Sequence, residues 1–391
     1  VPSRVRPVNG LRVRVGEHPD DLVAALAAEL DLPRDDPFEA DLVAVATPGQ
    51  GRWLMQQLGT VLGTAGGRTD GVAARIQLPT TSGLLRDLER DVLGITPDDD
   101  PWVIERLAWT MLRAFDRAAD EPWFRDIAVH VGDAERPGRR YGAARRFCAL
   151  FARYARWRPE LLTTPDTGSD AWQHELWTLL VSLVGEQPPW ERTAEAAARL
   201  REDPSLSSLP SQLSVWAPQR LAPGERTLLS SLGAGRDVTV WWPAASVQDG
   251  HLLTDRLGAA SHAARDVLAQ GARVEVIQRS QSEPATLLGR LQHQIRTGRA
   301  EHSPGDGTIR VHLSHGLDRQ VEVLRDALCD LFAEHPDLEP RDVVVCTPQL
   351  EDVAPLVRAL CMVDPELVGP DAHPVSRLRV QVTDPSTSRT N

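Results

Sequence analysis

The stretch Asp41-Leu-Val-Ala-Val-Ala-Thr47-Pro-Gly-Gln50 decides the fold class of this chain. The run Asp41–Thr47 is almost continuously apolar, which is typical of a strand buried on both faces of a parallel sheet. A Pro-Gly turn follows, and we expect a helix from about Gln50 to Leu62. The preceding residues have the same order, with a strand at Leu11–Val15 and an Ala/Leu-rich helix at Asp21–Leu32. Repeated strand–helix units predict an α/β fold with a doubly wound parallel sheet.

The pattern changes to consecutive helices between about Asp87 and Leu209, which predicts an all-helical insertion into the sheet domain. The clearest expected helices are Trp102–Phe115, Ala143–Ala155, Ala171–Val184 and Glu191–Leu200. Strands are expected again at Leu213–Trp216 and Val238–Trp242, each with helical stretches after it.

A Gly-, Ser- and Pro-rich stretch, Arg299–Thr308, is the best candidate for a linker. A last α/β block is expected after it. Its elements are a strand at Ile309–Ser314, a helix at Asp318–Ala333, a strand at Asp342–Cys346 and a helix at Val353–Leu360. A strand-like Leu378–Val382 lies shortly before Asn391, so we expect the sequence to be part of a longer chain.

The basic residues have an unusual composition. The 391 residues, enough for two to three domains, contain no lysine, so all 43 basic residues are arginine. A P-loop ATPase needs a lysine on the nucleotide phosphates. The sequence therefore predicts that this chain binds no ATP of its own.

Charge and cysteine content restrict the remaining classes. The formal net charge of −12 argues against a protein that coats nucleic acid with its whole surface. A local basic groove is still compatible with it, because screening makes the attraction of phosphate local. The four cysteines contain no Cys-x-x-Cys pair, and no apolar run is long enough for a membrane helix. We expect a cytoplasmic protein without a disulfide framework, a metal site or a catalytic centre in this chain.

The strongest local feature is the stretch Arg136–Arg158, which holds eight arginines and no acidic residue. At about 100° per residue, the aromatic and apolar side chains form one arc of a helix and the arginines form another. The apolar arc contains Phe147, Leu150, Phe151 and Tyr154; the basic arc contains Arg145, Arg146, Arg153 and Arg156. The basic arc has two open interpretations. It is either a phosphate-tracking wall for single-stranded DNA, or a solvated face or contact with an acidic partner.

Four segments in order along the chain resemble the RecC family, the gamma subunits of exodeoxyribonuclease V. The first is Asp35-Asp-Pro-Phe-Glu-Ala-Asp-Leu-Val-Ala-Val-Ala-Thr-Pro-Gly-Gln-Gly-Arg-Trp53. The second is His312-Leu-Ser-His-Gly-Leu-Asp-Arg-Gln-Val-Glu-Val-Leu324, which continues to Pro340-Arg-Asp-Val-Val-Val. Trp157-Arg-Pro159 and Ala171-Trp-Gln-His-Glu-Leu-Trp177 also match. The resemblance covers only the front third or so of a full family member.

The resemblance implies a superfamily 1 helicase architecture, built from RecA-like domains, whose motor is disabled. Residues 1–88 with 208–298 would form an inactive domain 1A, residues 89–207 the helical insertion 1B, and residues 308–391 the start of domain 2A. Where a motor has its phosphate loop, this chain reads Val15-Gly-Glu-His-Pro-Asp-Asp21, and three acids there would repel a triphosphate. Where an Asp-Glu pair would hold magnesium it reads Val215-Trp-Ala-Pro-Gln219, which offers a metal no carboxylate.

The resemblance also implies DNA contacts. Leu150, Arg158 and Arg192 match family positions implicated in reading the recombination hotspot Chi, and we add Arg153 from the basic arc. Ala149 and Ala152 stand where the family pattern has aspartates, which accept hydrogen bonds from bases as a methyl group does not. In the segment Thr47–Arg52, expected as a βα loop, Arg52 is a candidate phosphate contact; a plain βα turn is the alternative.

The function expected from the resemblance is a non-catalytic subunit of a RecBCD-type helicase–nuclease. Its partners would be single-stranded and double-stranded DNA ends and the RecB-like and RecD-like helicase subunits of a heterotrimer, with no membrane. ATP and Mg would act in those subunits. The alternatives are a related helicase–nuclease subunit with a nuclease centre beyond residue 391, or a protein-interaction scaffold without DNA contact.

Overall fold

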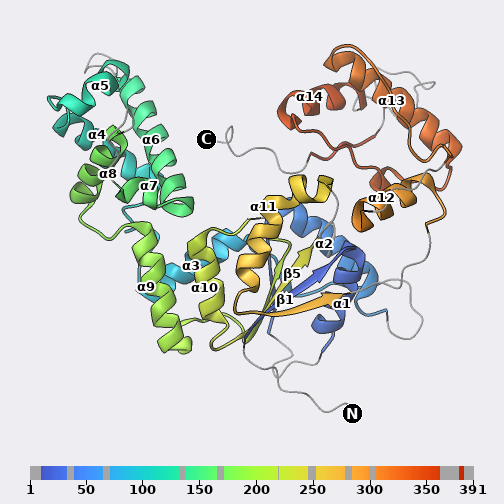
Figure 1. The fold of residues 1–391 in the computed structure, drawn as a ribbon, viewed down its shortest axis with the longest axis horizontal. Helices are drawn as coiled ribbons and strands as arrows, with labels where there is room; N and C mark the ends of the chain where they lie inside the picture. The colour runs from blue at the N-terminus through green and yellow to red at the C-terminus, as the bar shows by residue number, and fades with distance from the viewer. Residues whose placement is uncertain are drawn as a thin grey trace. The chain divides into compact units, whose positions relative to one another are not determined.

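The fold was determined as a computed structural model (Figure 1). The structure describes residues 10–32, 39–64, 71–131, 137–164, 171–218, 220–244, 252–277, 284–298, 304–361 and 378–382. The chain divides into two compact units, one of residues 1–281 with 295–298 and the other of residues 282–294 with 299–391. Within the described residues, no helix is long and apolar enough to cross a membrane.

The centre of the first unit is a parallel sheet of six strands in the order β3-β2-β4-β5-β1-β6. The strands are β1 (Gly10–Gly16), β2 (Asp41–Val45), β3 (Ile76–Gln77), β4 (Gln212–Trp216), β5 (Asp237–Pro243) and β6 (Arg273–Ile277). The predicted strands at residues 11–15, 41–47, 213–216 and 238–242 are all present. The two edge strands, β3 and β6, were not predicted from the sequence.

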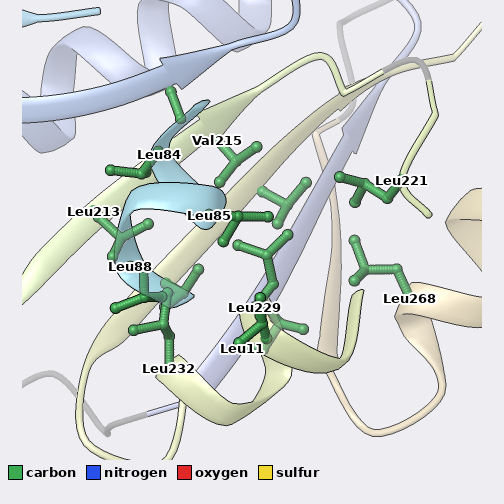
Figure 2. Close-up of a cluster of buried hydrophobic side chains, with 14 of the residues drawn as sticks. Leu11, Leu84, Leu85, Leu88, Leu213, Val215, Leu221, Leu229, Leu232 and Leu268 are labelled. Atoms are coloured by element: carbon green, nitrogen blue, oxygen red, sulfur yellow. The ribbon is translucent and has the colours of Figure 1, made fainter. Parts of the chain in front are cut away.

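Helices cover both faces of the sheet, as a doubly wound fold requires. On one face lie α1 (Pro19–Leu30) and α2 (Pro48–Val61), whose leucines pack on Val43, Trp216 and Trp241. On the other lie α3 (Thr81–Leu93), α9 (Pro189–Glu202), α10 (Pro223–Leu232) and α11 (Leu252–Ala269). Figure 2 shows this second core, in which Leu85 and Leu88 of α3 and Leu229 of α10 pack against strand residues such as Val215.

The chain leaves the sheet after β3 and returns to it at β4. The intervening helices are α4 (Ile104–Arg117), η1 (Pro122–Phe124), α5 (Arg125–Val131), α6 (Pro137–Trp157), α7 (Glu160–Thr163) and α8 (Ala171–Val184), followed by α9 and η2 (Pro204–Leu206). Helices α4 to α8 pack around a core of their own, which contains Met111, Phe115, Phe151 and Trp177 (Figure 1). The predicted α/β class with a doubly wound parallel sheet and an all-helical insertion is confirmed.

The second unit contains α13 (Leu317–Glu334), η3 (Pro340–Asp342), α14 (Leu350–Cys361) and most of α12 (Leu287–Thr297), whose last residues, 295–297, belong to the first unit. Helices α13 and α14 match the helices predicted at residues 318–333 and 353–360, and they share a small core. The boundaries proposed for the helicase-like domains remain a prediction, and residues 299–303 of the expected linker lie outside the described residues.

The strands predicted at Ile309–Ser314, Asp342–Cys346 and Leu378–Val382 are wrong in this structure, where these residues join no sheet. Their apolar side chains divide between two environments. Val343 packs against α13 and α14, whereas Val311 and Leu313 are 82% and 94% exposed. A strand needs a hydrogen-bonded neighbour and cover for its apolar face, and few-stranded sheets are marginal without both. The apolar pattern alone therefore led to strand predictions that the described part of this unit does not contain.

Candidate nucleic-acid interface

Three arginines form a row along the solvent-facing side of α6. Arg139, Arg146 and Arg153 are all exposed and lie seven residues apart. In an α-helix this spacing advances about 10.5 Å and turns only about 20°. The positions between them on the same face are small, Gly142 and Ala149, and both are exposed. We call Arg139, Arg146 and Arg153 the basic row. Because only small side chains lie between them, all three arginine side chains are accessible from solvent.

The charges of the basic row are not neutralised within the described residues, where none of its three side chains has an ion-pair partner. The other described arginines of the stretch are paired with acids from neighbouring elements. The pairs are Arg140–Asp116 (2.6 Å), Arg145–Glu105 (3.8 Å), Arg156–Glu225 (2.6 Å) and Arg158–Glu160. Arg136 lies outside the described residues. The predicted basic arc is thus divided, because Arg145 and Arg156 are paired whereas Arg146 and Arg153, together with Arg139 outside the arc, have no ion pair among the described residues.

The opposite side of α6 fixes the orientation of the row. Ala144, Cys148 and Phe151 are fully buried in the core of the helical insertion. Leu150 and Tyr154 are half-buried at the border between the two sides. Burial raises the pKa of the Cys148 thiol to about 12, so this side chain behaves as a small apolar residue. Because α6 is anchored by one arc, the basic row must face solvent.

Arg52 lies elsewhere, at the carboxyl edge of the sheet. The expected loop Thr47–Arg52 is instead the first turn of α2, because the Thr47 hydroxyl caps it by accepting from the backbone N–H of Gln50 (3.2 Å). The Gln50 side chain crosses to β4, accepting from Ala46 N (3.0 Å) and donating to the Ala217 carbonyl (3.4 Å). Arg52 is exposed on this turn.

Apolar side chains fill the carboxyl edge at the end of β4. Trp216 is fully buried, and its ring centroid lies 6.1 Å from that of Trp53. The chain then turns through Ala217 with a φ of 43°, a left-handed conformation that is uncommon for a residue with a Cβ. After β1, only Glu17 and His18 precede α1, which starts at Pro19 with Asp20 and Asp21 in its first turn. Among the described residues, no three His, Cys, Asp or Glu side chains gather as metal ligands would.

Arg192 is a buried structural residue and not a surface one. It is 6% exposed, donates to Asp100 (2.9 Å) and lies 3.6 Å from Glu89 of α3. Burial would raise the pKa of Asp100, but hydrogen bonds from Arg192 and the backbone N–H of Trp102 outweigh it and hold that pKa below its ordinary value. Burial raises the pKa of Glu89 despite a hydrogen bond from Thr193. This geometry argues against a direct DNA contact by Arg192, because its guanidinium is enclosed by the protein.

The predicted site residues therefore do not form one cluster. Leu150 and Arg153 share α6, Arg158 follows that helix in an exposed ion pair, Arg52 lies at the sheet edge and Arg192 is buried. The sequence analysis missed the pairing within the basic arc and the role of Arg139. The seven-residue spacing from Arg139 to Arg153 was the available signal.

The comparisons with known proteins agree on one family. A family model described as RecC, N-terminal domain, matches residues 11–248. The RecBCD enzyme subunit RecC of Mycobacterium tuberculosis is 38% identical over 97% of this chain and 38% of that protein. The same subunit of Mycolicibacterium smegmatis is 36% identical over 97% of this chain and 38% of its own length. That of Escherichia coli is 23% identical over 83% and 36%. The chain thus spans little more than a third of the length of the curated relatives it matches.

Proposed function

The chain belongs to the RecC family, and from that premise we propose that it is a non-catalytic subunit of a RecBCD-type helicase–nuclease, exodeoxyribonuclease V. In this proposal it guides unwound single-stranded DNA from a double-stranded end during double-strand-break repair and recombination. Its partners are RecB-like and RecD-like helicase subunits.

The basic row is the observation that carries the proposal. Three exposed guanidiniums, for which the described residues provide no ion pair, are separated by small side chains and form a track that a phosphate backbone can follow. The track is local, which is compatible with a net charge of −12 on the whole chain. Arg158 adds a further cation beyond the end of α6, although the Glu160 carboxylate paired with it offsets part of its attraction for phosphate.

The proposal assigns ATP and Mg to the partner subunits. Asp20 and Asp21 occupy the first turn of α1, where a helix N-terminus would otherwise attract phosphate. The buried Trp216 stands at the end of β4, where a magnesium site would need a carboxylate. Both features oppose a nucleotide at the carboxyl edge of this sheet.

The proposal also includes an altered reading of the recombination hotspot. Ala149 and Ala152 are exposed on α6 next to Leu150 and Arg153. Methyl groups accept no hydrogen bond from a base, so contacts at these positions would depend on shape and backbone charge.

Titrating single-stranded DNA across a salt series tests the proposal, with the complex assembled and ATP omitted. Each lost phosphate contact should lower the slope of log K against log salt by about 0.7, and by about 2 for Arg139→Ala, Arg146→Ala and Arg153→Ala combined. Arg199→Ala, on α9 in an exposed pair with Glu195, is the matched control and should leave the slope unchanged. An unchanged slope in the triple variant would identify the basic row as a solvated face or a protein contact, as a pure scaffold requires.

A further inference from the structure

A cavity of about 880 Å³ opens in the helical insertion beside the basic row. Its walls come from η1 and α5 on one side and from α6 and α8 on the other. This volume lies within the range of about 300–1,000 Å³ that small-molecule sites occupy.

Aromatic rings form much of the cavity wall. Trp123, Phe147 and Trp172 line it, and each is half-buried. The ring centroid of Phe147 lies 5.4 Å from that of Trp172, and Trp123 packs edge-on against the buried Phe124 at 5.6 Å. The rings are therefore held by their neighbours while part of each faces the cavity. Held rings of this kind suit stacking against a flat ligand, because little side-chain entropy is lost when the ligand binds.

Charged side chains also line the cavity. Arg139 and Arg146 of the basic row line it, and no described acidic side chain forms an ion pair with either. Asp126 and His130 of α5 contribute to the wall. The described residues of the site thus offer two arginine cations, one carboxylate and several ring faces.

We propose that this cavity takes one unstacked nucleotide of the single strand. The base stacks on the aromatic wall, its phosphate pairs with Arg139 and Arg146, and the Asp126 carboxylate accepts a hydrogen bond from an exocyclic amino group. The inference rests on the proposed function, because the two arginines belong to the track that the strand follows. It adds a preference at one position for a base with an exocyclic amino group, such as cytosine, over thymine, which has none.

An acidic peptide of a partner subunit is the competing occupant. It would use the two arginines but would face repulsion from Asp126, and it would leave the ring faces without flat partners. A nucleotide uses all three kinds of group, so the cavity chemistry favours it.

The test measures the affinity of the full-length chain, assembled with its partner subunits and without ATP, for oligonucleotides in which one abasic site is moved along the strand. One position should show a loss of about 5- to 150-fold, which corresponds to the stacking of one base. Ala143→Phe, which places a ring at the cavity wall, should weaken binding of the intact strand and abolish the effect of the abasic site. Ala194→Phe, at an exposed position of α9, is the size-matched control.

A second variant tests the proposal in case Ala143→Phe does not fold. Asp126 is exposed, so Asp126→Asn should fold normally and reduce the preference for cytosine over thymine at the sensitive position. An abasic scan without a sensitive position would overturn the cavity proposal, whereas the salt slopes of the basic-row variants would still test the strand path. Loss of partner subunits from Ala143→Phe with unchanged DNA affinity would also overturn it, and would identify a protein-docking cavity.

Discussion

Replacing Arg192 with alanine should destabilise the protein and not merely weaken DNA binding. The substitution removes the cation that pairs with two carboxylates, the buried Asp100 at 2.9 Å and the half-buried Glu89 at 3.6 Å. Breaking a buried ion pair from one side costs about 3–5 kcal/mol, because the remaining charge stays buried without compensation. Arg90 still lies 3.3 Å from Asp100, so the lower end of this range, about 3 kcal/mol, is expected.

Thermal unfolding measures the loss of stability in Arg192→Ala, and its pH dependence shows whether the two carboxylates cause that loss. A loss of about 3 kcal/mol corresponds to a decrease in Tm of about 6–12 °C in a unit of this size. Asp100 has a depressed pKa in the wild type, so its stabilising contribution is present above the unfolded-state pKa and is lost as the pH falls through the folded pKa. Without Arg192 the folded pKa values of Asp100 and Glu89 should rise, and the variant should then lose stability as the pH increases through them. The difference between wild type and variant should therefore narrow on acidification from pH 7 to about pH 4.

Arg153→Ala is the control, because this exposed side chain has no ion pair among the described residues and its loss should change stability by about 0.5 kcal/mol or less. The burial argument would be refuted by an Arg192→Ala variant that unfolds like the wild type at both pH values while binding single-stranded DNA more weakly. Arg192 would then act on DNA directly.

Three further outcomes are expected. ATP with magnesium should not raise the Tm of the isolated chain; a nucleotide-dependent increase would contradict the role assigned to Asp20, Asp21 and Trp216. Ser214→Ala should lower the free energy of unfolding by denaturant by about 1–3 kcal/mol. The buried Trp241 Nε1 donates to the Ser214 hydroxyl at 3.1 Å and loses its acceptor in this variant. Ser182→Ala, at an exposed helix position, is the comparison. Cys148, with a pKa of about 12, should resist alkylation at pH 8 in the native protein while the exposed Cys346 reacts, and equal rates by mass spectrometry would show that the insertion core opens readily.

Local periodicity predicted the elements whose burial is one-sided or complete. Strands such as β2 and β5 are buried along nearly their whole length and read as continuous apolar runs. The two arcs of α6 followed from the 3.6-residue period alone. Strand β3 has only two residues, too few for any period to register. Strand β6 (Arg-Val-Glu-Val-Ile) does alternate, so its period of two residues is the local signal that predicts it.

The site was less predictable because pairing depends on contacts that are distant in sequence. Arg192 follows Pro-Pro-Trp-Glu, and no neighbouring residue in the sequence indicates that Arg192 pairs with the carboxylate of Asp100 in the fold. In the same way, Glu225 of α10 neutralises Arg156 of α6. The cavity needs α5 and α8 beside α6, so no single segment of sequence contains its signal.

The strand order has a consequence for how the chain is made. Among the strands that the structure describes, β1 is synthesised first, yet its two neighbours in the sheet are β5, which starts at Asp237, and β6, which starts at Arg273. At about 5–20 residues per second, roughly 10 to 45 s of synthesis separate the first strand from its first partner. During that time the helical insertion is completed and is able to collapse around its own core, whereas the apolar strand β1 stays without its sheet neighbours; β2 can pair earlier, with β3 and then β4. Nascent chains of this topology should depend on chaperones that shield β1, and slower translation before Asp237 should increase aggregation.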